Sequence, residues 1–201
     1  GKQPALMTLE VVRPERRDPI GEFNSTSVWE RGSAEERPGG FTLIPFGGVM
    51  SWAIASNRIY ISEGMDYEVW VFDERGDLTG VLREETPYLA ITPVDRDIYL
   101  EERVAEERPH PDDVPSAERL GAYQRLIVSH EGELWAQWVD RPTDSGTSWT
   151  VFSPDGSMAR RIVLPKVDVL AIRGGKIYGH VESALGIQTV VIFDVPGWDV
   201  R

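Results

Sequence analysis

Short hydrophobic runs bounded by turn residues recur along most of this chain and predict β-strands. Three times, a run containing Ile-Tyr or Leu-Trp is followed by a run that ends in Phe and by a turn that contains Gly. The copies span 58–76, 133–156 and 176–197. Phe152 and Phe193 lie 41 residues apart, and Phe72 and Phe152 lie 80 apart, which falls to the same period once the 39 residues of segment 84–122 are left out. A period of about 40 residues that carries several short strands is typical of four-stranded β-propeller blades.

Chance similarity among ordinary hairpins is the alternative explanation, and it accounts for one pair of copies better than for three copies at one period. The strands expected in the three copies are 52–55, 58–62, 67–72 and 78–82; 126–128, 134–139, 148–152 and 159–164; and 169–172, 176–181 and 188–193. The strands expected upstream are 8–12, 25–30 and 41–46, joined by longer links rich in Gly and Pro. The expected fold is therefore all-β, a single partial β-propeller domain of about three blades and part of another. Its parts are a divergent partial blade at 1–47, blades at 48–83, 123–165 and 166–201, and a helical insertion at 84–122.

The insertion 84–122 interrupts the repeat and predicts a helix. Thr92-Pro93-Val94-Asp95 places an N-cap Thr before a Pro at the first helical position and an acid at the third. Apolar residues between 98 and 105 fill the helix, and Pro109 and Pro111 are expected to end it. The insertion holds 11 acidic and 4 basic residues, and we expect most of this charge to lie on a solvated helix face.

The topology of a four-stranded blade places this insertion on one face of the predicted propeller. The connection from an outer strand to the next inner strand lies on the same side as the link between the second and third strands, so the insertion shares its face with loops 63–66, 140–147 and 182–186. We call this the insertion face. Its loops vary in length between copies, and variable loops on a rigid scaffold are where binding sites are usually built. The candidate ligand-binding residues are Asp66, Tyr67, Trp138, Arg141, Asp144, His180 and Glu182.

The composition excludes several classes of function. The chain of 201 residues contains no Cys, which rules out disulfides, thiolate metal sites and a Cys nucleophile. The formal net charge of −12, from 33 acidic against 21 basic residues, and the lack of a Lys/Arg run argue against nucleic acid and against an anionic membrane surface as partners. No apolar stretch approaches the roughly 20 residues of a membrane-spanning helix, so no membrane insertion is expected.

Acidic turns and histidines are the candidates for metal chemistry. Asp73 and Asp155 lie in the turns that follow the Phe residues, and their carboxylate oxygens could bind calcium. These turns lack the ligand spacing of an EF-hand loop. The Pro and Gly of 153–156 are those of a tight hairpin turn, so we expect no cofactor, and no motif supports calcium. His180 and Glu182 alternate on one predicted strand and project to one side. Such a pair can act as a general base or a metal ligand, although a hydrogen-bonded, partly buried His is the more common outcome.

Familiar catalytic motifs are missing from the sequence. No nucleophile elbow, P-loop, His-Glu-x-x-His motif or dinucleotide fingerprint occurs. No sequence motif therefore supports the function of a common hydrolase, kinase or dehydrogenase. The seven Trp residues can either stack on a ligand or pack between blades. We expect packing for Trp70, Trp135 and Trp149, whereas Trp138, at the edge of a variable loop, is the candidate for a ligand groove.

Several of these runs together resemble a known family. They are 58–61, 67–73, the Thr92-Pro93 helix start, 123–128 and 132–136. Over most of 52–194 the chain resembles the C-terminal half of bacterial six-bladed, NHL-like β-propeller proteins. The resemblance implies six blades, an extracytoplasmic location in many members and a binding or interaction role. Related propellers include calcium-dependent lactonases and lyases, but none of their catalytic residues can be placed on this chain.

The sequence favours a non-catalytic β-propeller module that binds a small ligand or a protein partner through the insertion face. The alternative is a metal-assisted hydrolase or lyase near the propeller axis, which requires His180 to converge with acids from two other blades. A third interpretation, a structural spacer, predicts no concave pocket on the insertion face. The first residues contain neither Met nor a signal-peptide pattern, and the last blade lacks its outer strand, so the rest of a propeller or a second copy is expected to close the ring.

Overall fold

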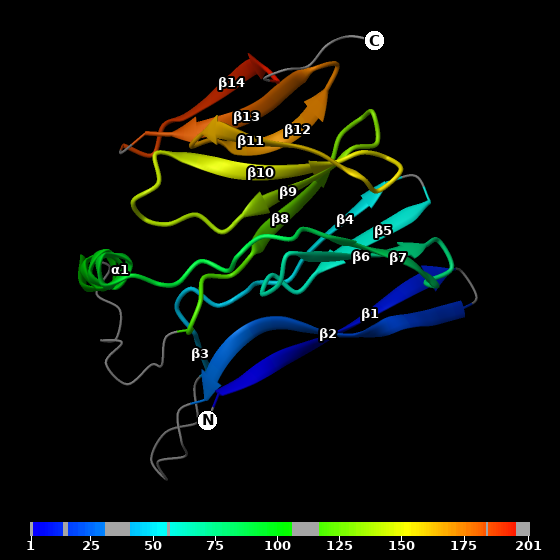
Figure 1. Ribbon diagram of the computed structural model, residues 1–201, viewed down its shortest axis with the longest axis horizontal. Helices are drawn as coiled ribbons and strands as arrows, with labels where there is room; N and C mark the ends of the chain where they lie inside the picture. Colours follow the sequence, from blue (N-terminus) through cyan, green and yellow to red (C-terminus); the bar gives the residue numbers. More distant parts are fainter. Residues whose placement is uncertain are drawn as a thin grey trace.

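The predicted strands assemble into four antiparallel sheets, which make the chain all-β (Figure 1). The computed structural model describes residues 2–13, 16–30, 41–55, 57–105, 117–183 and 185–195. The N-terminal sheet contains β1 (Lys2–Arg13), β2 (Arg16–Glu30) and β3 (Phe41–Leu43). The first repeat sheet contains β4 (Ser51–Ala55), β5 (Arg58–Ser62), β6 (Glu68–Asp73) and β7 (Leu78–Arg83). The second repeat sheet contains β8 (Tyr123–Val128), β9 (Leu134–Trp138), β10 (Gly146–Phe152) and β11 (Met158–Pro165). The third repeat sheet contains β12 (Asp168–Arg173), β13 (Lys176–Glu182) and β14 (Gln188–Asp194).

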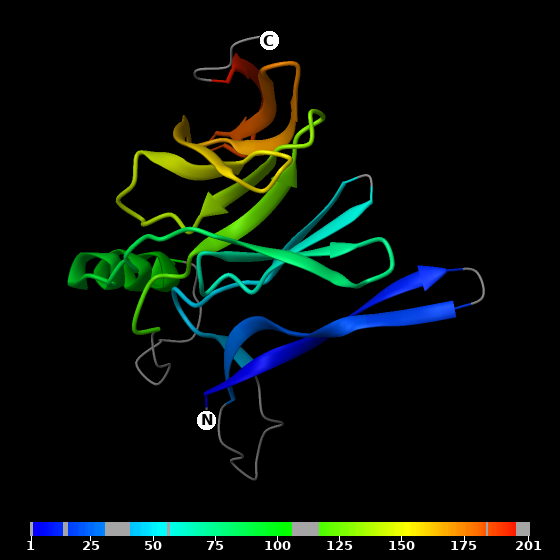
Figure 2. The ribbon, with the colours of Figure 1, turned by 45° about the vertical axis from the view of Figure 1, so that its right-hand side comes forward.

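Each repeat sheet is a meander in which strands that follow one another along the chain pair side by side. Figures 1 and 2 show the sheets stacked like successive blades, from the N-terminal sheet at the bottom to the third repeat sheet at the top. The observed strands of the repeats lie within a few residues of the predicted ones, and the expected all-β fold is confirmed. The expected strand 41–46 ends early, because the chain turns at Ile44, whose carbonyl accepts the Gly47 amide at 3.1 Å.

The repeated Gly closes the same turn in successive sheets, at the end of the sheets opposite to the helix (Figure 1). Gly76 and Gly156 have φ angles of 88° and 89°, a region in which a side chain would be strained. Asp73 Oδ1 accepts the amides of Asp77 and Arg75 at 3.0 and 2.8 Å, and these bonds hold the pKa of the Asp73 carboxyl below its usual range. The acid therefore serves the turn itself, as the hairpin interpretation predicts.

Aromatic and aliphatic side chains fill the spaces between neighbouring sheets. Trp135 and Trp149 are fully buried, and their rings meet edge to face with centroids 6.2 Å apart, in a cluster that includes Ile177 of the third repeat sheet. Trp70 packs on Phe23 of the N-terminal sheet with ring centroids 5.4 Å apart. The predicted packing role of these three Trp residues is confirmed.

The N-terminal sheet differs from its prediction. Separate strands at 8–12 and 25–30 joined by long links are wrong, because β1 and β2 form one long hairpin. Pro19 lies inside β2, where it pairs with Glu10 next to a register shift. A bulge of this kind accommodates Pro, and β3 pairs with the last residues of β2, well away from Pro19. A Pro that normally marks a link is therefore tolerated within this strand.

The insertion contributes α1 (Pro93–Ala105), which begins where the sequence predicts. Thr92 Oγ1 accepts the Asp95 amide at 3.2 Å, and the Asp95 carboxylate accepts the Thr92 amide at 2.9 Å and the Thr92 hydroxyl at 2.8 Å. This reciprocal arrangement is a capping box. The predicted end of the helix at Pro109 and Pro111 lies outside the described residues.

Candidate functional site

The insertion returns to the sheets on the face that the blade topology predicts. The amide of Ala122 donates to the carbonyl of Gly64, in loop 63–66, at 2.7 Å. Gly64 has a φ of 79°, and a Cβ atom on it would lie 2.4 Å from the carbonyl oxygen of Val49, so this junction requires Gly. Figure 1 shows α1 at the same end of the sheets as the connection between β13 and β14.

Arg141 fastens the start of α1 to the second repeat sheet. Its guanidinium forms an ion pair with the Asp95 carboxylate and donates to the Ala90 carbonyl at 2.8 Å. The Asp144 carboxylate accepts the Arg141 amide at 2.8 Å, which fixes the loop that carries Arg141. Burial raises the pKa of Asp95, but the hydrogen bonds from Thr92 and the charge of Arg141 outweigh burial and lower that pKa below 3.8.

A second contact fastens the segments on either side of the helix. Asp66 Oδ1 accepts the hydroxyl of Tyr88 at 2.6 Å and the guanidinium of Arg119 at 2.8 Å. The Arg119 guanidinium lies 3.5 Å from the centroid of the Tyr88 ring, a cation–π contact. Asp66 is therefore bound within the chain by two residues of the insertion.

Glu84, the first residue of the insertion, is buried between the first and second repeat sheets. Its Oε2 accepts the hydroxyls of Tyr123 and Thr150 at 2.9 and 2.5 Å, and its Oε1 meets the guanidinium of Arg161. Thr150 Oγ1 also accepts the indole N–H of Trp138 at 2.8 Å. Burial, followed by the negative charge of Glu84, raises the pKa of the Tyr123 hydroxyl. We expected most of the insertion's charge to lie on a solvated helix face, and Glu84 and Asp95 are two of its acids that are buried instead.

Tyr67 and Trp138 pack beside this network, with ring centroids 5.0 Å apart. Tyr67 is almost fully buried, and burial raises the pKa of its hydroxyl, with Glu84 as the next cause. Five of the predicted site residues thus gather around the insertion and contact one another or the chain around them. They are Asp66, Tyr67, Trp138, Arg141 and Asp144.

The other two predicted residues lie on the third repeat sheet. Glu182 is exposed at the end of β13, where it accepts the side-chain amide of Gln188 at 3.4 Å. His180 Nδ1 lies 3.7 Å from Asp168 Oδ2. Asp168 also forms an ion pair with Arg125 of the second repeat sheet, so His180 stands beside a polar contact between the two sheets.

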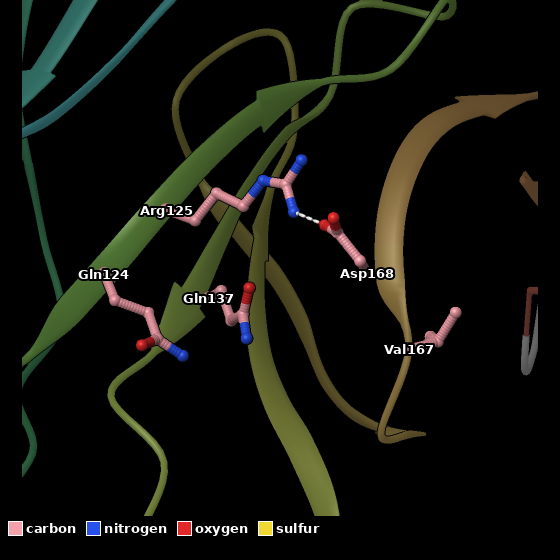
Figure 3. Close-up of a pocket in the computed structure, with 5 residues that line it drawn as sticks. All are labelled: Gln124, Arg125, Gln137, Val167 and Asp168. Carbon is pink, nitrogen blue, oxygen red and sulfur yellow. Dashed lines mark hydrogen bonds and ion pairs between the residues drawn. The ribbon is translucent and has the colours of Figure 1, made fainter. Parts of the chain in front are cut away.

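That contact lines a polar cleft of about 370 Å³ between β8, β9 and the start of β12 (Figure 3). Its lining residues are Gln124, Arg125, Gln137, Val167 and Asp168. The cleft opens at the insertion-face end of the strands, because Gln124 lies near the start of β8, Gln137 lies near the end of β9, and Asp168 begins β12. Gln124 lies at a register shift in the pairing of β8 with β9, a kind of bulge that often re-aims a side chain beside a site.

Hydrogen bonds orient the two amides of the cleft. Gln124 Nε2 and Gln137 Nε2 both donate to Asp140 Oδ2, at 3.2 and 3.3 Å. Burial raises the pKa of Asp140, the two amides oppose this effect, and the charge of Asp144 adds to it. Because the amide nitrogens face Asp140, the amide oxygens are the acceptors left to a ligand, and Figure 3 shows the Gln137 oxygen on the side of the Arg125 and Asp168 ion pair.

The sequence interpretation missed the cleft residues, although one signal was present. Gln137 and His180 occupy equivalent positions after Leu134-Trp135-Ala136 and Ile177-Tyr178-Gly179. A polar residue at the same step of two repeated strands indicates a polar site that recurs near the ends of those strands.

The part of the chain that the structure describes contains no set of side chains arranged to bind a metal ion. No group of three His, Asp or Glu side chains there comes together as metal ligands, and His180 pairs with Asp168 of its own sheet. Among the described helices, none is long and apolar enough to span a membrane. No protein-family model matches the chain, and no curated protein is matched by it, so the resemblance to NHL-like propellers stays a prediction.

Proposed function

We propose that the chain is a β-propeller-type binding module that takes a small polar ligand in the cleft of the insertion face. The observation that carries this proposal is the cleft lined by Gln124, Arg125, Gln137, Val167 and Asp168. Side chains from two sheets converge there, and concave sites with a few placed polar groups are where small molecules usually bind. The propeller interpretation is supported by the shared 41-residue period and by apolar packing that repeats from sheet to sheet.

The ligand class follows from the groups that line the cleft. The charges of Arg125 and Asp168 already compensate each other, so the cleft offers little net attraction to an ion. The amide oxygens of Gln124 and Gln137 accept hydrogen bonds, and the guanidinium donates them. A hydroxyl group both donates and accepts, so a hydroxyl-rich, uncharged molecule such as a sugar or a cyclic polyol fits this mixture.

The test is a titration of the isotope-labelled protein with a panel of monosaccharides, disaccharides and cyclic polyols, followed by NMR. We expect at least one of them to move the side-chain amide signals of Gln124 and Gln137 in a saturable way, while the exposed amide of Asn57, outside the cleft, stays still. Gln137→Ala removes one ligand acceptor and is expected to weaken that binding by about 3- to 10-fold.

Gln188→Ala is the matched control, because it removes an exposed amide outside the cleft and should leave the affinity unchanged. The proposal fails if no member of the panel gives a saturable shift at the cleft. It also fails if Gln137→Ala binds as tightly as the wild type.

A further inference from the structure

The polar residues beside the cleft occupy the same step in each repeat sheet. Ser62, Gln137 and His180 lie at equivalent positions of the second strands, and each pairs with a polar neighbour on the first strand. The cross-strand pairs are Ser51 with Ser62, Arg125 with Gln137, and Asp168 with His180. Histidine is the one residue type among these whose charge ordinarily changes between pH 5 and 8. This polar step therefore carries one pH-sensitive group, His180.

Asp168 connects His180 to the cleft. One carboxylate oxygen of Asp168, Oδ2, lies 3.7 Å from His180 Nδ1, and the other, Oδ1, forms the ion pair with Arg125 that lines the cleft (Figure 3). While His180 is neutral, the charges of Arg125 and Asp168 compensate each other. A proton on His180 changes the formal charge of the three groups from zero to +1, because Asp168 then faces two cations. The attraction of the cleft for an anion thus depends on the protonation of His180.

Other titratable groups lie around His180 and the cleft. β14 places the apolar Val190 opposite His180. Asp140, which accepts the amides of Gln124 and Gln137, has a pKa raised by burial, so it also loses negative charge on acidification. The charged or titratable neighbours are Asp168 of β12, Arg125 of β8, Glu182 of the same strand, and Asp140 with the nearby charge of Lys166. A test of His180 must therefore separate its effect from that of Asp140.

We propose that the cleft binds an acidic sugar, and that protonation of His180 strengthens this binding. The proposal rests on the proposed function, since it uses the same cleft and the same hydroxyl-binding amides, and it adds a carboxylate to the ligand. That carboxylate lies toward Arg125, whose guanidinium forms strong charge-assisted hydrogen bonds with carboxylates. His180 acts through Asp168, by reducing how far Asp168 compensates Arg125. An uncharged sugar in the same cleft has no charge for His180 to act on.

Binding of two matched pairs of sugars by the full chain tests the proposal. The pairs are glucose with glucuronate and galactose with galacturonate, measured by NMR titration at about pH 5 and about pH 8, the limits between which histidine changes its charge. Arg125, Asp168 and His180 are between 24 % and 46 % exposed, so water screens their interactions. We expect at least one acid to bind about 3- to 10-fold more tightly at the lower pH, and the affinity of its parent sugar to change by less than about 2-fold.

His180→Gln should remove most of this pH dependence. Gln suits the position, because Gln137 occupies the equivalent place in the second repeat sheet. His130→Gln is the matched control, since His130 is exposed in the turn between β8 and β9, at the opposite end of the strands, and this variant should keep the full pH dependence. A His180→Gln protein that keeps the wild-type ratio of affinities overturns the proposal and assigns the pH dependence to Asp140.

The wild-type titrations decide the question independently of how the variants fold. If the uncharged sugars bind while the acids bind no better at the lower pH, this inference is overturned and the proposed function stands. If neither acid binds at the lower pH, the inference is overturned as well. Failure of every sugar of the wider panel, charged or uncharged, would overturn the proposed function together with it.

Discussion

Replacing Glu84 by Leu tests whether this buried carboxylate holds the insertion to the sheets. The Glu84 side chain is 1 % exposed, and its two hydroxyl donors belong to Tyr123 and Thr150, which are fully buried. Leu would leave the Tyr123 hydroxyl without its acceptor, at a cost of about 1–3 kcal/mol. Arg161 would lose its ion-pair partner, but its side chain is 47 % exposed, so water compensates most of that loss. We expect Glu84→Leu to lower the free energy of unfolding by about 3 kcal/mol.

Urea unfolding followed by Trp fluorescence measures this change. Tyr123→Phe removes the donor alone and is expected to cost about 1 kcal/mol. The double variant should be more stable than the sum of the single effects by about 1 kcal/mol or more, because no hydroxyl is then left unpaired. A Glu84→Leu protein that unfolds at the same urea concentration as the wild type would refute the reasoning. Additivity within about 0.5 kcal/mol would refute it too.

Two further predictions concern the attachment of the insertion. Gly64→Ala should destabilise the protein by about 2 kcal/mol or more in urea unfolding, because Gly64 has a positive φ and the new Cβ would overlap the Val49 backbone. Gly80→Ala is the control: no atom lies within 4 Å of its Cβ position, so the free energy of unfolding should change by less than about 1 kcal/mol. The folded pKa of Asp95 lies below 3.8, so its stabilising contribution is complete above that pH and is lost as the pH falls through the folded pKa. The NMR signals of α1 should therefore broaden or shift on acidification below about pH 4, while the repeat sheets stay folded. Asp95→Asn should remove this pH dependence. Identical acid titrations of the wild type and the variant would contradict the prediction.

Local patterns in the sequence predicted the repeat sheets well, because each strand and turn is specified by residues close together along the chain. Gly76 and Gly156 close the same turn in successive sheets, and the spacing of the Phe residues that precede such turns gave the period. The long N-terminal hairpin could not be predicted this way, because a Pro such as Pro19 normally marks a link between strands. β2 tolerates Pro19 because a register shift lies next to it and because β3 pairs only with the last residues of β2. A helix start such as Thr92 with Asp95 was predictable because both partners lie within one turn.

The candidate site was predictable as a face but not as a set of side chains. Topology alone places the insertion beside loops 63–66 and 140–147. The hydrogen bond from Ala122 to Gly64 and the ion pair of Arg141 with Asp95 join the insertion to these two loops. Which residues then meet depends on side-chain directions across sheets that are distant in sequence. Arg125 and Asp168, for example, are 43 positions apart, and nothing in either local pattern indicates their pairing. The buried role of Glu84 was hidden for the same reason, because its partners lie in the second repeat sheet.

The contact between Glu84 and Tyr123 also bears on how the insertion could be gained or lost. These residues mark its two ends, and the Tyr123 hydroxyl reaches the Glu84 carboxylate at 2.9 Å. A segment that leaves and rejoins a scaffold at neighbouring points can be shortened, lengthened or exchanged while the strands on either side keep their positions, since the entropy of closing a loop changes slowly with its length. The insertion is in this sense a replaceable segment of the chain. A different segment placed between β7 and β8 would therefore change the surface at this end of the sheets without moving the strands.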